Sequence, residues 1–108
     1  MNLSKQKCSS SGKQESLQEQ TQIDLKAQLS EGWEVINGHH LEKTFPFKEF
    51  SKRLAFTNLV ANLGEEEGHH PDIHLSWQRV RIAIWTSAVN GLTKADFILA
   101  AKIDKISL

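Results

Sequence analysis

Cysteine is almost absent from the sequence, since Cys8 is the only one among 108 residues. A single cysteine cannot form a disulfide within the chain, and it excludes a metal site built from several thiolates. A lack of disulfides is typical of a reducing compartment, so we expect a cytoplasmic protein. We expect Cys8 itself to be inert, with a redox or metal-binding role as the alternative.

An excess of charge and a long hydrophobic run are also absent. The 13 Lys and Arg residues equal the 13 Asp and Glu residues, so the formal net charge is zero. No excess of positive charge therefore favours nucleic acid or an anionic membrane as the main partner. No apolar run approaches the roughly 20 residues of a membrane span, and the N-terminus lacks the apolar segment of a signal peptide. A neutral small domain is poorly soluble as a monomer, which favours self-association.

Large apolar side chains are scarce in residues 1–20, where Ser, Gln, Lys and Gly dominate. Such a segment cannot bury enough surface to offset the entropy lost on ordering. We therefore predict a flexible polar tail over residues 1–20 and one folded domain over residues 21–108. A domain of this size buries about two-thirds of its unfolded surface, which is enough for a core without disulfides.

The first half of the domain has the pattern of a helix followed by a hairpin. Residues 21–29 carry apolar side chains at mixed spacing shortly before a glycine, which predicts a short helix. Residues 33–36 and 41–47 have the pattern of strands, and the Asn-Gly pair between them is a strong hairpin signal. Pro46 lacks an amide hydrogen, so we expect it at a sheet edge or at the end of its strand.

The second half repeats this order with a longer helix. Residues 48–68 place apolar side chains three and four positions apart and end on a glycine, which predicts a helix. Residues 73–77 and 80–85 alternate and are joined by Gln-Arg, which predicts a second hairpin. A T-x-x-D pattern at 93–96 predicts a capped final helix. The expected fold is α+β in the order α-β-β-α-β-β-α, with a four-stranded antiparallel sheet covered by three helices on one face.

Three histidines lie in the stretch EGHHPDIH. Loop histidines beside glycine and proline are most often solvated. As an alternative, His70, Asp72 and His74 would share one face of a strand and offer three metal ligands, although no fourth ligand or known metal signature is present. A second pair, His39 and His40, follows the Asn-Gly turn and is expected to be exposed.

Acid–base chemistry is a further alternative for the tandem pair His69 and His70. Imidazole has a pKa of about 6.5 and can both give and take a proton near neutrality. If the preceding helix reaches His69, Glu65 lies one turn below it and can orient the ring and favour its protonated form. Pro71 forces His70 toward an extended conformation, so the two rings leave the helix end at different angles.

Several stretches carry a more specific signal. They read GWEVINGHHLEKTFPFKEF, EEEGHHPDIHLSW, VRIAIWT and NGLTKADFILAAKID, with a Lys-Cys pair near the N-terminus. Together they resemble the pterin-4a-carbinolamine dehydratase family, also called dimerisation cofactor of a homeodomain transcription factor. The resemblance covers nearly all of the chain, and E-x-x-x-H-H-P is its most distinctive part.

The resemblance implies a four-stranded antiparallel sheet with three helices on one side, and assembly into homodimers or homotetramers. It also implies dehydration of 4a-hydroxytetrahydrobiopterin to quinonoid dihydropterin, which recycles the cofactor of aromatic amino acid hydroxylases. Neither a metal nor a bound cofactor is required in that family, so the expected ligand is the pterin substrate alone.

By the same resemblance, His69 and His70 are the acid–base pair and Glu65 is their upstream carboxylate. Pro71 matches a rigid proline beside the pair. Trp33 matches a tryptophan near the pterin pocket, with a plain core position as the alternative. Trp77 stands where the family has an aromatic residue, and we expect it to pack against other side chains and not to contact the ligand.

The sequence departs from the family pattern at Ser87. The family normally has a histidine there, at the end of the fourth strand, whereas this chain reads WTSA. Serine can donate a hydrogen bond but is a poor proton shuttle near pH 7, and loss of an acid–base group costs roughly 10²–10⁴ in rate. We therefore expect either a slow dehydratase that relies on His69 and His70, or a non-catalytic relative that acts through protein interactions.

Overall fold

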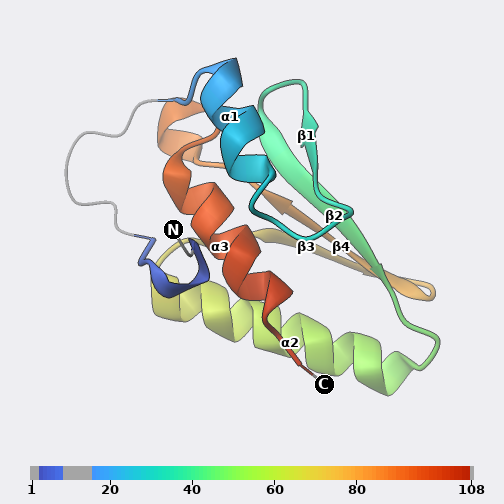
Figure 1. The fold of residues 1–108 in the computed structure, drawn as a ribbon. Helices are drawn as coiled ribbons and strands as arrows, with labels where there is room; N and C mark the ends of the chain where they lie inside the picture. The colour runs from blue at the N-terminus through green and yellow to red at the C-terminus, as the bar shows by residue number, and fades with distance from the viewer. Residues whose placement is uncertain (1–2, 9–15, 108) are drawn as a thin grey trace.

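The computed structural model describes residues 3–8 and 16–107. Its elements follow the chain as η1 (Leu3–Lys5), α1 (Glu19–Lys26), β1 (Glu34–Ile36), β2 (His40–Pro46), α2 (Phe50–Glu67), β3 (Asp72–Ser76), β4 (Arg79–Ile84), η2 (Ser87–Val89) and α3 (Lys94–Asp104). The predicted order α-β-β-α-β-β-α is confirmed (Figure 1), with two short 3-10 helices in addition.

Four antiparallel strands form one sheet in the order β1-β2-β4-β3. Asn37 and Gly38 form the turn between β1 and β2, and both have positive φ, 54° and 65°. This is the backbone that the Asn-Gly pair predicts for a tight hairpin. Pro46 is the last residue of β2, where its missing amide hydrogen is tolerated.

The second hairpin turns one residue earlier than predicted. Ser76 pairs with Arg79, so Trp77 and Gln78 form the turn. The expectation that Trp77 packs is wrong within this chain, because its side chain is 80% exposed. Alternation of apolar residues indicates two strands but does not fix which two residues adopt the turn conformation.

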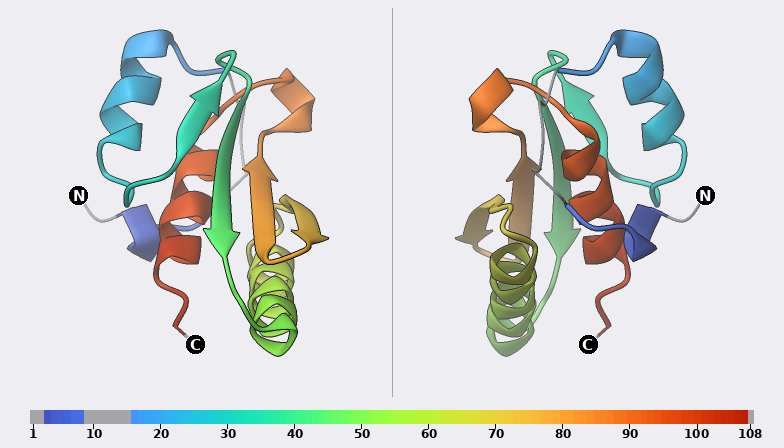
Figure 2. Two further views of the ribbon diagram at one scale, coloured as in Figure 1. Left: turned by 90° about the vertical axis from the view of Figure 1, so that its right-hand side faces the viewer. Right: turned by 90° about the vertical axis from the view of Figure 1, so that its left-hand side faces the viewer.

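The two faces of the sheet differ in polarity. Leu41, Val80, Ile82 and Ile84 point to one face and are fully buried. Helices α1, α2 and α3 lie on that side (Figures 1 and 2), whereas the opposite face carries exposed polar side chains such as Arg81. Because successive side chains of a strand alternate between faces, the apolar positions of the sequence form a single inner layer.

Helix α3 contributes most of its length to the core. Its buried residues include Phe97, Ile98 and Leu99, and its first turn forms the predicted capping box between Thr93 and Asp96. None of the helices in the described residues is both long and apolar enough to cross a membrane.

Residues 3–8 differ from the flexible tail that the sequence predicted. Leu3 (2% exposed) and Cys8 (6% exposed) lie in the core. The ammonium group of Lys102 in α3 donates a hydrogen bond to a backbone carbonyl of η1 at 3.0 Å. Composition missed this because two apolar side chains, together with hydrogen bonds such as those from Lys102 to η1 and from the amide of Cys8 to Glu67, dock the short segment. Residues 1–2 and 9–15 of the predicted tail lie outside the described residues, whereas α1 already begins at Glu19, within the stretch predicted as tail.

Candidate active site

The end of α2 positions the histidine pair. Gly68 caps the helix in the left-handed conformation (φ 67°), and the amide of His69 donates to the carbonyl of Gly64 at 3.1 Å. A Cβ atom at position 64 would lie 2.8 Å from Cδ of Pro71. Gly64 is therefore required so that the segment from His69 to Pro71 can lie directly against α2.

The ring of His69 is held by a buried carboxylate. Nε2 of His69 lies 2.5 Å from Oδ1 of Asp96, which is fully buried. The other oxygen, Oδ2, accepts hydrogen bonds from the hydroxyl of Thr86 at 2.9 Å and from the amide of Thr93 at 2.8 Å. These three contacts compensate the buried charge of Asp96. They also orient His69 so that Nδ1 is the ring nitrogen available to a ligand.

Glu65 contacts His70 and not His69, which corrects the sequence prediction. Nε2 of His70 lies 2.8 Å from Oε1 of Glu65, and the two side chains are 67% and 76% exposed. The prediction required α2 to continue through His69, whereas the helix ends at Glu67 and the backbone turns left-handed at Gly68. An exposed pair of this kind contributes little to stability and holds its partners loosely.

His69 and His70 line a cavity of about 330 Å³ beside the end of α2, which we call the histidine cavity. Ser87, at the position where the family resemblance predicts a histidine, lines the same cavity. Its other walls are small or apolar side chains and one indole, namely Cys8, Gly68, Trp85, Thr86, Ala88 and Ala95. The structure thus brings together three residues that the sequence singled out.

Trp33 and Pro71 do not line the histidine cavity in the described part of the chain. Trp33 is 2% exposed, and its Nε1–H donates to Asp104 at 2.9 Å. Its ring also packs edge-on against Phe45, so the core alternative holds for Trp33 in this chain. Pro71 borders a neighbouring hollow on the open face of the sheet, and its contact with Gly64 supports the histidine segment from behind.

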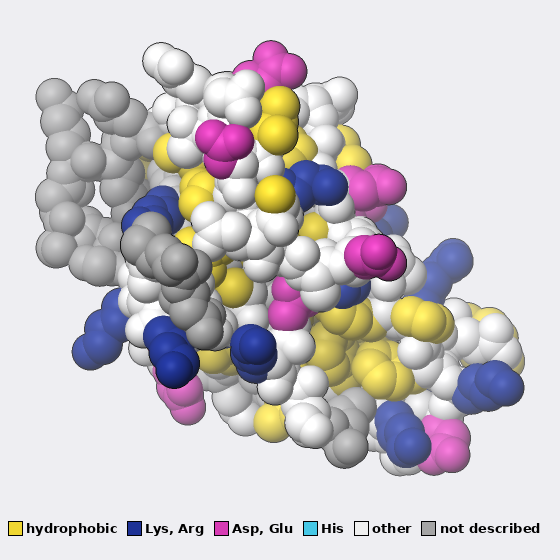
Figure 3. Space-filling view, viewed as in Figure 1, with side chains coloured by type: hydrophobic (Ala, Val, Ile, Leu, Met, Phe, Trp, Pro, Cys, Tyr) yellow, Lys and Arg dark blue, Asp and Glu magenta, His cyan; other side chains and the backbone are white. Residues whose placement is uncertain are grey.

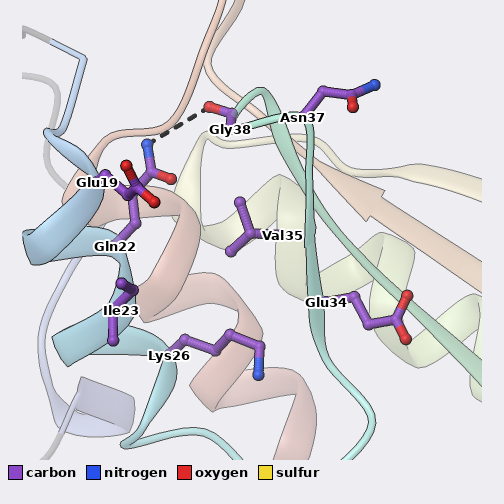
Figure 4. Close-up of a pocket in the computed structure, with 8 residues that line it drawn as sticks. All are labelled: Glu19, Gln22, Ile23, Lys26, Glu34, Val35, Asn37 and Gly38. Carbon is purple, nitrogen blue, oxygen red and sulfur yellow. Dashed lines mark hydrogen bonds between the residues drawn. The ribbon is translucent and has the colours of Figure 1, made fainter.

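A larger groove of about 690 Å³ lies between α1 and β1 (Figure 4). Its walls carry the charged side chains of Glu19, Lys26 and Glu34, and the amide group of Gln22 donates to the carbonyl of Gly38 at 3.4 Å. The described residues that line it include no histidine, so the groove offers no imidazole to exchange protons near neutrality. The groove is the larger of the two, but the histidine cavity carries imidazoles that can transfer protons and is therefore the better candidate active site.

The metal-site alternative has no counterpart in residues 3–8 and 16–107. No group of three or more His, Cys, Asp or Glu side chains in these ranges is arranged to hold a metal ion. His74 lies on the exposed face of β3, where its Nδ1 is 3.1 Å from a guanidinium nitrogen of Arg81.

Sequence reasoning missed the contact between Asp96 and His69. Asp96 was predicted only as a helix-capping residue, yet it caps α3 through one oxygen and holds His69 through the other. A usable signal existed, because residues 97–101 are entirely apolar and predict burial of α3 on all sides. A carboxylate in the first turn of such a helix needs further partners.

Comparison with known proteins decides the family. The family model described as "Pterin 4 alpha carbinolamine dehydratase" matches residues 14–106. The chain belongs to this family. The resemblance read from the sequence is therefore confirmed.

Relatives within this family are similar over most of the chain. A protein of Alkaliphilus metalliredigens, provisionally named a pterin-4-alpha-carbinolamine dehydratase, is 52% identical over 79 residues, which are 73% of this chain and 71% of that protein. The mitochondrial pterin-4-alpha-carbinolamine dehydratase 2 of Arabidopsis thaliana is 45% identical over 94 residues, which cover 83% of this chain and 50% of that protein.

A solved structure supports the fold of this dehydratase-family chain. The crystal structure described as transcriptional coactivator/pterin dehydratase from Brucella melitensis matches with a TM-score of 0.74 at 30% identity. The match covers 81% of this chain and 93% of the other. The α+β fold with a four-stranded antiparallel sheet is therefore the fold of the family.

Proposed function

We propose that this protein dehydrates 4a-hydroxytetrahydrobiopterin to quinonoid dihydropterin in the cytoplasm, as a step in recycling the tetrahydrobiopterin cofactor. Family membership and the names of its relatives support the reaction class. The observation that carries the proposal is the contact of His69 with buried Asp96 at the wall of a cavity that His70 and Ser87 also line.

The reaction needs one proton donor and one proton acceptor. The bond between C4a and the hydroxyl oxygen breaks, the oxygen takes up a proton and leaves as water, and the ring nitrogen N5 loses its proton as the C4a–N5 double bond forms. Atoms and charge balance without a redox partner or a bound cofactor. Two imidazoles near neutral pH can supply both proton transfers.

We assign the base to His69. The carboxylate of Asp96 accepts from Nε2 of His69, so the neutral ring carries its lone pair on Nδ1. When Nδ1 takes the proton from N5, the resulting imidazolium lies beside a buried anion that stabilises it. Because Thr86 and Thr93 hold the other oxygen of Asp96, the carboxylate keeps its position during proton transfer.

His70 is then the acid that protonates the leaving hydroxyl. Its ring is exposed and lies 2.8 Å from Oε1 of Glu65, so it is accessible to a ligand in the histidine cavity. Ser87 can donate a hydrogen bond to a ligand in the same cavity but cannot relay a proton near pH 7. Turnover therefore rests on two histidines, and we expect it to be slower than that of a family member with three.

The test uses 4a-hydroxytetrahydrobiopterin generated in place by a hydroxylase. Purified wild-type protein should consume it faster than the spontaneous dehydration, and His69→Ala or His70→Ala should lower the excess rate by about 10²–10⁴. His74→Ala serves as the matched control, since His74 lies outside the histidine cavity. Spontaneous kinetics with wild-type protein would refute the enzymatic function.

Protein interaction is a second candidate function, favoured by apolar side chains at the surface. Phe50, Leu54 and Leu59 on α2 are 59%, 42% and 40% exposed, and Trp77 is 80% exposed. Figure 3 shows hydrophobic side chains at the surface beside the N-terminal half of α2. Such a surface suits association, and assembly into homodimers or homotetramers is the simplest use of it.

Oligomeric state tests this second proposal. Sedimentation velocity should give a dimer or tetramer for wild type, and Leu54→Glu should shift the protein toward monomer with the fold retained by circular dichroism. A monomeric wild-type protein at micromolar concentration would rule out self-association as the purpose of this surface.

A further inference from the structure

Two histidines that the proposed reaction does not use pack around Trp85. Nδ1 of His39 lies 3.0 Å from Nδ1 of His40, and Nε2 of His39 lies 3.0 Å from the amide oxygen of Asn90. The imidazole centroids of His39 and His40 are 5.4 Å and 5.9 Å from the Trp85 ring. The sequence predicted an exposed pair, whereas both residues are half-buried and held in a cluster.

Two imidazole rings contact Trp85, and hydrogen bonds hold both of them. His40 also contacts Glu42 at 3.3 Å, so each of the two imidazoles is hydrogen-bonded at both nitrogens. Asn90 follows η2, the short helix that carries Ser87, and adopts a left-handed backbone. The indole is thereby linked to β2 and to the loop that forms one wall of the histidine cavity.

Trp85 itself lines the histidine cavity together with His69, His70 and Ser87. Trp85 directly follows Ile84, whose side chain is fully buried under the helices, so alternation sends the indole toward the opposite face. The same indole borders the neighbouring hollow that Pro71 lines. Among the described residues that line the histidine cavity, Trp85 has the largest aromatic ring system.

We propose that Trp85 is the surface on which the pterin ring packs, and that His39 and His40 hold its indole in position. This inference rests on the proposed function, because it takes the ligand to be a pterin. Apart from the tetrahedral C4a of the hydroxylated substrate, the pyrimidine ring of a pterin is a conjugated, nitrogen-rich face of amide and guanidine groups, and such faces stack on indole. Stacking on Trp85 would hold the ligand in the cavity that His69 and His70 also line.

The experiment separates binding from chemistry. The probe for binding is 7,8-dihydrobiopterin, a flat pterin that has no 4a-hydroxyl to lose, and the probe for chemistry is the hydroxylase-coupled dehydration. Loss of one aromatic stacking contact corresponds to roughly a tenfold weaker affinity. Trp85→Leu should raise Kd and KM by about tenfold with kcat changed by less than about threefold, and Trp85→Phe should recover most of the affinity.

Trp77→Leu is the matched control, since Trp77 is exposed in the β3–β4 turn and does not line the histidine cavity. It should leave Kd unchanged. His39→Ala should raise Kd by a smaller factor, and adding it to Trp85→Leu should change little more, because the histidine acts through the indole. Circular dichroism of each variant checks that the fold is retained.

The outcomes separate the two proposals. If Trp85→Leu binds 7,8-dihydrobiopterin as tightly as Trp77→Leu does, Trp85 is not the pterin surface, whatever the activity. If His39→Ala and Trp85→Leu weaken binding independently, the positioning role of His39 is wrong. If wild type binds the probe through Trp85 but gives no dehydration above the spontaneous rate, the binding inference stands and the proposed reaction fails.

Discussion

His69 and Asp96 lie 27 positions apart in the chain, and Nε2 of the histidine is 2.5 Å from Oδ1 of the aspartate. The contact joins the end of α2 to the start of α3. One carboxylate therefore caps a helix and orients a ring of the histidine cavity. A change at Asp96 should affect both the fold and the proposed chemistry.

Replacement of Asp96 by Asn should lower kcat by a large factor, with a comparatively small loss in the free energy of unfolding. The amide keeps the shape of the side chain but removes the anion beside His69, so the imidazolium loses its stabilisation. We expect a kcat lower by about 10²–10⁴, measured with the coupled dehydration assay. Asp24→Asn is the control, since Asp24 is exposed and does not line the histidine cavity. Equal losses in the two variants would contradict the assignment of His69 as the base.

Replacement of Gly64 by Ala should displace the histidine segment. The new Cβ would meet Cδ of Pro71 at 2.8 Å and the carbonyl oxygen of His69 at 3.2 Å, so one of these groups must move. We expect a loss of about 1–3 kcal/mol in the free energy of unfolding, together with a lower kcat.

Gly68→Ala separates steric contact from backbone strain in this test. A Cβ at Gly68 meets nothing within 4 Å, but the residue has φ 67°, which costs about 1–2 kcal/mol for alanine. Chemical denaturation and the dehydration assay should therefore give a stability loss in both variants, with the larger loss of activity in Gly64→Ala. An unchanged activity in Gly64→Ala would mean that Pro71 moves without moving the histidines.

Replacement of Ser87 by His should raise the rate. Ser87 lines the histidine cavity with His69 and His70, so a third imidazole there can share in proton transfer. We expect kcat to rise by at least about tenfold in the dehydration assay. Ser87→Asn is the control, because it adds a hydrogen-bonding group of similar size that does not titrate. A rise of equal size in both variants would point to ligand positioning and not to proton transfer.

Cys8 should make stability fall in alkaline solution. Burial, and next the carboxylate of Glu67, raise the pKa of the Cys8 thiol from 9.0 to about 12. The thiol of the unfolded chain therefore ionises at a lower pH than the thiol of the folded chain. The contribution of the protonated thiol to the free energy of unfolding is complete below pH 9 and is lost as pH rises toward 12.

Urea denaturation at pH 8 and at pH 10.5 measures this effect. Wild type should lose more unfolding free energy between the two values than Cys8→Ala, which has no thiol to ionise. Native Cys8 should also react slowly with iodoacetamide at pH 8, because the thiol stays protonated and buried. Equal pH dependence in the two proteins would exclude a buried, protonated thiol at position 8.

Local sequence was enough to predict the elements and the two hairpins. The Asn37-Gly38 turn, the glycine that ends α2 and the capping box at Thr93 each act within a few residues, through backbone conformation and short-range hydrogen bonds. The alternation of apolar side chains likewise identified the inner face of the sheet. Patterns of this kind are local, so they can be read without the fold.

Tertiary structure alone decided the partners of the functional side chains. The ends of α2 and α3 meet in space, which pairs His69 with Asp96 and leaves Glu65 to His70. The same packing buries Trp33 and brings Trp85 to the cavity. No periodic pattern encodes such contacts, because they depend on how separate elements pack. A helix that is one residue longer or shorter also brings different side chains together.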